Sequence, residues 1–375
     1  MRTHGKRASL LSRLGCAVVA AAALAACGSD RPAGGGQLDR AALGVTDATF
    51  ADLKKLYRAA LDEGGELVFY GTNHEVLAPV YEKFEKNFPG IKIETHQQTG
   101  AQQMASLQAD RASGNHVADI LQSPNALRYV NAGFAQPYEP PTFRDVKGID
   151  GKVRDGLHDR QFRYSTPLFA LFGIGVNTEL INPAEVPRNW QDFADGKWAG
   201  KVLLHDPTVP GGGQGILTRL LLSNTVDEAW LAGIAHNSTL KGDYATAVQS
   251  LVRGEYPILL AAAGADLERS AGQGAPVKFL LMDKDNIGLA DKWMLLDGAP
   301  HPQTAKLFLN YLYIDLGQQA IADIGNLPIS GNARSPHNWP TFTDAKLADL
   351  PPEAEITAQN DRVVAILTRI FRRGS

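Results

Sequence analysis

Cysteine is nearly absent from this chain of 375 residues, which contains only Cys16 and Cys27. Cys16 lies in an apolar run near the start of the chain, and we expect that run to be removed from the mature protein. A mature chain with Cys27 alone cannot form an internal disulfide or a thiolate metal site. If Cys27 is itself modified, as its surroundings indicate, no cysteine nucleophile remains either.

Catalytic signatures are also missing. The chain has no Gly-x-Ser-x-Gly elbow of the α/β-hydrolase type. His74-Glu75 lacks the second histidine that a zinc protease needs at helical spacing. The glycine-rich segment 211–215 lacks the Gly-Lys-Ser/Thr end of a P-loop, and Ile216 stands where a dinucleotide fingerprint has its last glycine. We therefore expect neither enzymatic activity nor a cofactor.

The first 26 residues combine basic residues with an apolar run over 14–26, which is the layout of a secretory signal. The run is too short to span a bilayer, which takes ~20 apolar residues. Leu24-Ala25-Ala26-Cys27 resembles a bacterial lipobox, in which the cysteine is acylated and becomes the first mature residue. Residues 28–37 have the composition of a flexible tether. We expect a protein held outside the cytoplasm at the cell membrane by a lipid on Cys27. The alternative is an ordinary signal cut at an Ala-x-Ala site, with a cysteine there by chance.

Charge of one sign is not concentrated in this chain. It has 37 basic and 40 acidic residues and a net charge of −3. No dense block of basic residues appears except the pair Arg372-Arg373 near the end of the sequence. Nucleic acid is therefore not expected as a partner. A mature chain of about 350 residues favours two domains, because single cores stop growing near ~250–300 residues.

Strand and helix patterns alternate along the chain. Three strand-then-helix units follow one another, which predicts a parallel sheet covered by helices and hence an α/β fold. A second α/β block begins near Pro167. The first three predicted strands are 66–70, 91–95 and 117–121, and the helices after them are 76–88, 102–112 and 125–132.

In open sheets of this kind the ligand crevice lies beyond the carboxyl ends of the strands. The segments that follow the three predicted strands are polar and can present backbone N–H groups and hydroxyls. Their candidate ligand contacts are Thr72, Asn73, Thr99, Gly100 and Ser123.

A glycine loop in the second block is a further candidate. It comprises Gly211, Gly212, Gly213 and Gln214, and it opens a predicted helix after the strand 201–205. Free N–H groups and the positive end of a helix dipole suit an anion. A tight turn that contacts no ligand explains the same glycines, and the sequence does not decide between the two interpretations.

Two further kinds of side chain are interpreted as structural. Trp190, Trp198, Trp230 and Trp293 are expected to pack in cores, because aromatic side chains bury large areas. Asp119 is expected to cap a neighbouring backbone turn.

Several stretches, taken in order, carry a resemblance to a known family. They are 56–70, 84–93, 118–120, 190–202, 206–207, 245–254, 305–312 and 317–318. Together they resemble extracellular solute-binding proteins of ABC importers, in the iron, thiamine and organic-anion branch of the two-lobed type II periplasmic-binding-protein family. The similarity runs from about Thr46 to Phe371.

The resemblance implies two α/β lobes that close on a solute and deliver it to an ABC permease in the membrane. The segments 168–176 and 287–296 would be the hinge strands, and the protein would be a monomer. The expected boundaries are a signal peptide over 1–26, a tether over 27–45, lobe 1 over 46–167 plus 290–375, and lobe 2 over 168–289.

One departure from the family concerns the solute. Ferric-iron members carry adjacent tyrosines after the strand that corresponds to 256–261, where this chain has only alanines up to Ala263. Alanine offers Fe(III) no ligand atom, so we expect no bound metal and an organic anion or zwitterion instead. Asp243 and Asp266 could hold an amine, although both could equally begin helices in solvent.

Other functions stay open at this point. They are a ferric-iron-binding member of the same family, a hydrolase built on the same lobes, and a sensor whose closed form docks on a membrane receptor.

Overall fold

The computed structural model describes residues 37–98 and 100–373. The expected signal peptide, the lipidation site Cys27 and the candidate Thr99 lie outside this part of the chain. In the described part, no helix has both the length and the apolar character needed to cross a bilayer.

One ten-stranded sheet runs through the described chain in the order β2-β1-β3-β9-β4-β7-β5-β6, with β8 and β10 each paired to β4. Parallel strands form both ends of this order, as the alternating patterns predicted. The strands are β1 Glu66–Gly71, β2 Lys92–Gln97, β3 Ile120–Ser123, β4 Ser165–Asn177, β5 Val202–His205, β6 Ser238–Lys241, β7 Ile258–Ala263, β8 Val277–Leu280, β9 Ile287–Leu295 and β10 Leu327–Pro328.

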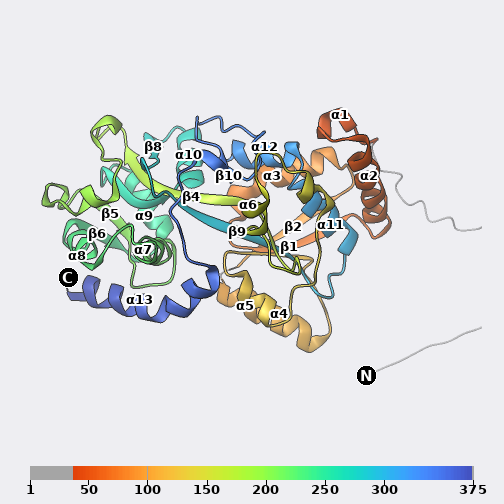
Figure 1. Ribbon diagram of the computed structural model, residues 1–375, viewed down its shortest axis with the longest axis horizontal. Helices are drawn as coiled ribbons and strands as arrows, with labels where there is room; N and C mark the ends of the chain where they lie inside the picture. Colours follow the sequence, from red (N-terminus) through yellow and green to blue (C-terminus); the bar gives the residue numbers. More distant parts are fainter. Residues whose placement is uncertain (1–36, 99, 374–375) are drawn as a thin grey trace, which may run out of the picture. The chain divides into compact units, whose positions relative to one another are not determined.

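The two long central strands, β4 and β9, pair antiparallel with each other. β9 also pairs with β3, and β4 pairs with β7, so these two strands join the two parallel sets. Figure 1 shows them running side by side between the two ends of the sheet. The segments predicted as hinge strands are thus the central crossing strands; a hinge motion about them stays a prediction.

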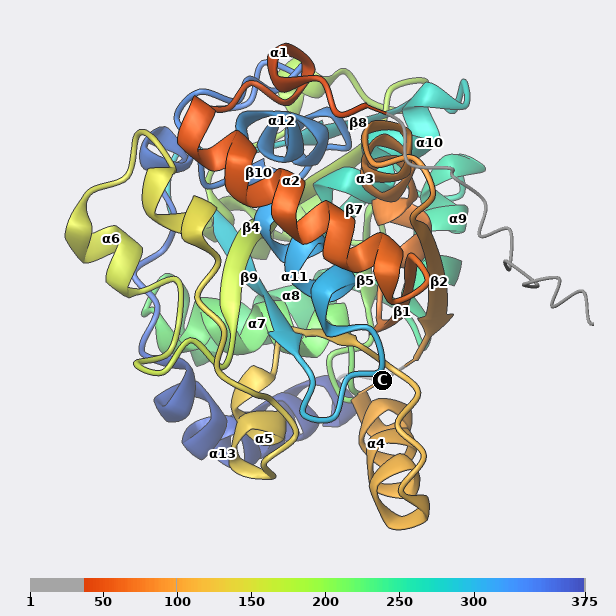
Figure 2. The same cartoon turned by 90° about the vertical axis from the view of Figure 1, so that its right-hand side faces the viewer.

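Both faces of the first parallel set are covered by helices. Leu67 and Phe69 of β1 pack into the core beneath α2, α3, α11 and α12, while Val68 and Tyr70 pack on the other face with α4 and α5. Alternate burial on two faces explains the continuous apolar run of β1. Figure 2 shows α2 lying across α11. These helices are α2 Asp47–Asp62, α3 His74–Asn87, α4 Gly100–Ser113, α5 Ala126–Asn131, α11 Pro302–Tyr311 and α12 Asp315–Asp323.

Helices likewise cover the second parallel set. α7 and α8 pack on one face, and α9 and α10 on the other. Trp190, Trp198 and Trp230 are buried in the first of these cores, and Trp293 is buried beside Phe69, so the expected packing role of the tryptophans is confirmed. The helices are α7 Gly212–Leu222, α8 Glu228–Asn237, α9 Tyr244–Val252 and α10 Gly264–Gly272.

The last helix, α13 (Glu353–Arg373), packs against the helices of the second parallel set. It contacts α7 and α8 (Figure 1), and Val363, Leu367 and Phe371 are buried in their core. The predicted boundaries had assigned 290–375 as a whole to lobe 1. The apolar stripe marks which face of a helix is covered, but it carries no information about which element covers it. The division of the chain into lobes, including the assignment of 290–375, stays a prediction.

The segment 303–324, predicted as one helix, forms α11 and α12. Gly317 lies so close to the end of α11 that a Cβ there would stand 1.9 Å from the Tyr311 carbonyl oxygen. The remaining short elements are α1 Arg40–Leu43, α6 Gly151–Asp155 and the 3₁₀ turns Pro141–Asp145, Pro183–Glu185, Trp190–Ala194, Gly196–Trp198 and Phe342–Asp344.

Asp119 is a structural residue, as expected, but it binds backbone far away along the chain instead of capping a neighbouring turn. Its fully buried carboxylate accepts hydrogen bonds from the backbone N–H groups of Val68, at 2.8 Å, and His301, at 2.6 Å. It therefore ties the start of β1 to the chain entering α11.

Phe308 is the centre of the first core and provides a test of its packing. Its buried ring lies 4.9 Å from that of Phe84 and 5.6 Å from that of Trp293, centroid to centroid. We expect Phe308→Ala to lower the free energy of unfolding by ~3–5 kcal/mol, because the cavity adds to the lost apolar transfer. Urea unfolding measures this. Leu180→Ala, at a side chain that is 51% exposed, is the control and should change stability by less than ~0.5 kcal/mol.

Candidate functional site

The side chain of Gln122, at the end of β3, joins the strand ends of the first parallel set. Its Oε1 accepts hydrogen bonds from the backbone N–H of Thr72, at 2.8 Å, and from the Thr72 hydroxyl, at 3.2 Å. Its Nε2 donates to the carboxylate of Asp291 in β9. The candidate Thr72 is therefore held against β3, and through Gln122 it is tied to a central strand.

The other candidates of the first set lie beside this cluster in the chain or are bonded to its neighbours. Gln97, at the end of β2, donates to the Thr72 carbonyl and accepts from the His74 N–H, so it encloses the exposed Asn73 between two bonded neighbours. The Tyr129 hydroxyl lies 3.1 Å from the carbonyl oxygen of Gly100. Ser123 is buried beside Gln122. The strand ends β1, β2 and β3 thus place Thr72, Asn73, Gly100 and Ser123 near one another.

His205 organises the glycine loop of the second parallel set. Its Nδ1 accepts a hydrogen bond from the Gly213 N–H at 3.1 Å. Burial lowers the pKa of His205, which keeps the ring neutral and Nδ1 free to accept. Gly211 has φ of +149°, and a Cβ at Gly213 would lie 2.0 Å from the His205 carbonyl oxygen. The close approach of the loop to His205 explains why glycines are needed here.

Two N–H groups in the first turn of α7 point to an anion. The N–H of Gly213 is bonded to His205, and that of Gly215 to the Gly211 carbonyl. Among the described residues, the N–H groups of Gly212 and Gln214 have no hydrogen-bond partner. Such groups at a helix N-terminus, together with the helix dipole, favour a negatively charged group.

Tyr244 links the glycine loop to the end of β7. Its hydroxyl accepts a hydrogen bond from the Ala263 N–H at 2.6 Å, and its ring would lie 3.6 Å from a Cβ placed on Gly212. The candidate Asp243 precedes it and caps α9, accepting from the Thr246 N–H at 2.8 Å. The capping role matches the interpretation of Asp243 as a helix start.

Arg269 connects the two sets of strand ends. Its guanidinium lies 3.1 Å from the carboxylate of Glu75 in α3 and 3.4 Å from that of the candidate Asp266 in α10. Burial raises the pKa of Asp266. α3 begins after Asn73 and α10 begins after Ala263. The ion pair between Arg269 and Glu75 therefore joins two helices that each start at a candidate segment.

The structure therefore brings the predicted residues into two groups, and their part in binding stays a prediction. Gln122, His205, Tyr244 and Arg269 were not chosen from the sequence. His205 could have been found, because it directly ends the strand before the glycine loop. The roles of Gln122 and Arg269 depend on contacts with residues far along the chain, for which the sequence has no local signal.

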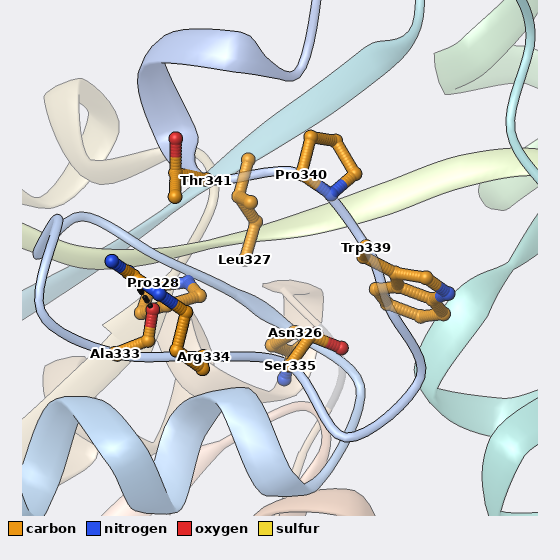
Figure 3. Close-up of a pocket in the computed structure, with 9 residues that line it drawn as sticks. All are labelled: Asn326, Leu327, Pro328, Ala333, Arg334, Ser335, Trp339, Pro340 and Thr341. Atoms are coloured by element: carbon orange, nitrogen blue, oxygen red, sulfur yellow. Dashed lines mark hydrogen bonds between the residues drawn. The ribbon is translucent and has the colours of Figure 1, made fainter.

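A small pocket lies at β10 and in the loop that follows it (Figure 3). Arg334 at its edge donates to the Ala333 carbonyl at 3.0 Å, and none of the predicted site residues lines it. In the described part of the chain, no group of three or more histidine, cysteine, aspartate or glutamate residues is arranged to hold a metal ion. The pocket is lined by Asn326, Leu327, Pro328, Ala333, Arg334, Ser335, Trp339, Pro340 and Thr341.

The family model described as bacterial extracellular solute-binding protein matches residues 71–318. None of the curated proteins matches the sequence.

Solved structures share the fold. The periplasmic binding protein AfuA from Actinobacillus pleuropneumoniae, with fructose-6-phosphate bound, has a TM-score of 0.66 and 19% identity over 82% of this chain and 99% of its own. Iron-bound HitA from Pseudomonas aeruginosa has a TM-score of 0.65 and 16% identity over 81% and 99%. The substrate binding protein of an ABC transporter from Agrobacterium tumefaciens has a TM-score of 0.67 and 14% identity over 82% of this chain and 96% of its own. The expected α/β architecture of the type II periplasmic-binding-protein kind is confirmed.

Asp291, which anchors Gln122, provides a test of this buried network by its titration. Burial raises the pKa of Asp291 from 3.8 to about 6. An acid of this kind favours the folded state while it is protonated. Its contribution is complete below about pH 4 and is lost as the pH rises through about 6, a change of ~3 kcal/mol.

We expect Asp291→Asn, which keeps an oxygen for Gln122 but cannot ionise, to escape this loss. The free energy of unfolding of the variant should therefore increase relative to that of the wild type as the pH rises from about 4 to about 7. Urea unfolding of both proteins across this range measures the difference. A difference that is constant with pH would show that Asp291 titrates normally.

Proposed function

The chain belongs to the bacterial extracellular solute-binding protein family, and we propose that it captures a small organic anion or zwitterion for delivery to an ABC permease. Binding proteins of this fold enclose solutes of different chemistry, so the solute class has to be argued from this chain's own residues. The observation that carries the choice of an anion is the pair of N–H groups of Gly212 and Gln214, which have no partner among the described residues.

The first strand ends supply complementary polar groups. Thr72 is held by Gln122, and Asn73 is exposed beside it. These side chains could bond the hydroxyl or carbonyl groups of an organic solute, while the glycine loop takes its carboxylate or phosphate. If the solute also carries an amine, the candidate acid is Asp266 beside Ala263, which would exchange its ion pair with Arg269 for one with the amine.

Ferric iron is the alternative cargo, and the residues at the end of β7 argue against it. Fe(III) is a hard cation that favours oxygen anions, but Ala261, Ala262 and Ala263 offer none. The phenol close to this strand end is Tyr244, whose hydroxyl accepts the Ala263 N–H. Burial raises the pKa of Tyr244, which disfavours the phenolate that iron would need.

We also propose that lipid on Cys27 anchors the mature protein to the cell membrane, that it acts as a monomer, and that it releases its solute unaltered. A hydrolase on the same fold would need a nucleophile or base facing the solute. The charged side chains near the two groups of candidates are instead paired with each other or cap helices. We propose that β4 and β9 act as the hinge during closure on the solute.

The solute itself is the direct test. We expect mass spectrometry of the purified protein, released by denaturation, to find a small organic acid or zwitterion at near-stoichiometric amount, and calorimetry to show that the same compound rebinds. Prolonged incubation should return it unchanged. A coloured preparation with an iron charge-transfer band would replace the organic anion by iron, and a converted compound would indicate an enzyme.

The glycine loop is tested by Gly212. A side chain is tolerated there, because a Cβ would meet only the Tyr244 ring at ordinary contact distance. We expect Gly212→Asp to weaken binding of the co-purified acid by ~10-fold or more, since it sets a negative charge at the helix N-terminus. Gly212→Asn has the same size without the charge and should retain most of the affinity. Equal affinities of the two variants by calorimetry would remove the loop from the site.

A further inference from the structure

Three charged side chains meet where β9, α7 and α13 come together. Glu353, the first residue of α13, places its carboxylate 3.5 Å from the ammonium of Lys292 and 3.6 Å from the guanidinium of Arg219. All three are largely withdrawn from solvent, with side-chain exposures of 18%, 6% and 9% respectively. The cluster lies outside both groups of candidate residues.

Each cation of this cluster also donates a hydrogen bond to a backbone carbonyl in or next to a candidate segment. Lys292 is opposite Ser123 in the β3–β9 ladder, and its ammonium donates to the Pro124 carbonyl at 2.9 Å. Arg219 donates to the Gly215 carbonyl at 3.1 Å, within the first turns of α7, which opens with the glycine loop. The two cations thus hold the end of β3 on one side and the start of α7 on the other.

We propose that Glu353 is a positioning residue for solute binding, which sets the separation between the Ser123-Pro124 turn and the glycine loop by bridging Lys292 and Arg219. This inference rests on the proposed function, because it assumes that both segments contact the solute. It assigns the C-terminal helix a part in binding, although α13 carries no candidate contact of its own.

Electrostatics gives the reason for the bridge. Burial lowers the pKa of Lys292 and of Arg219, which shows that both charges are costly to keep away from water. Two neighbouring cations in such surroundings repel strongly unless a carboxylate lies between them. Removing the charge of Glu353 would therefore drive the two segments apart. The start of a helix is also a favourable place for a carboxylate, because of the helix dipole.

The chain contains a matched control two residues further on. Glu355 is in the same first turn of α13, so it has nearly the same relation to the helix dipole. It is exposed, and its carboxylate accepts a hydrogen bond from Gln359 at 3.0 Å. Glu355→Gln removes the same charge from the same turn without touching the cluster.

The distance between the two halves of the sheet provides the decisive measurement. In the full chain with Cys16→Ser and Cys27→Ser, spin labels at Ala109→Cys on α4 and Ala232→Cys on α8 occupy exposed helical sites. We expect Glu353→Gln to shift the interspin distribution to longer distances and to broaden it, while Glu355→Gln leaves it unchanged. Adding Lys292→Met to Glu353→Gln removes the repulsion and should restore the wild-type distribution.

Affinity provides the second reading, with inorganic phosphate as the probe in calorimetry. Glu353→Gln should weaken phosphate binding about tenfold, within the range of known couplings between sites, and Glu355→Gln should not. Circular dichroism checks that each variant is folded. If Glu353→Gln alone does not fold, the double variant Glu353→Gln, Lys292→Met replaces it in both measurements. An unchanged distance distribution would overturn the inference, as would a shifted distribution with unaltered affinity. The distances are measured without solute, so they stand apart from whether the proposed function holds.

Discussion

The antiparallel pairing of β4 with β9 is the constraint on which the rest of the structure depends. Each of these strands also pairs with a parallel set, so the two halves of the sheet share them. The helices that cover each half are positioned by its strands, and the strand ends carry the candidate residues. Any rearrangement of one half against the other must pass through these two strands.

The hydrogen bonds around the strand ends show how the site is tied to this central pair. Gln122 connects Thr72 to Asp291 of β9, and Lys292 of the same strand holds the Pro124 carbonyl. Neighbouring residues of one crossing strand therefore anchor two candidate segments from its opposite faces. In the other half, His205 and Tyr244 fix the glycine loop and the end of β7. The candidate contacts are thus held by the buried side chains of Gln122, Asp291, Lys292 and His205 and by the half-buried Tyr244.

Much of the fold was accessible from the sequence, because period and turn residues report local structure. The apolar run of β1 and the stripe of α3 are examples. The partner of α13 was not, since an apolar stripe shows which face is covered but not which element covers it. The same limit applies to the site. Gly212 and Thr72 stand out by type and place, whereas Gln122 and Arg269 matter only through contacts with Asp291 and Glu75, which lie far away along the chain.

The contact between Gly213 and His205 restricts how this protein can diversify. Because a methyl group at Gly213 would collide with the His205 carbonyl, this position can offer a bound molecule only its main chain. Main-chain recognition is the same for every acid group of similar shape. A change in the bound solute during evolution would therefore have to come from side chains around Gly213, such as Tyr244 and Asp266, while position 213 remains a glycine.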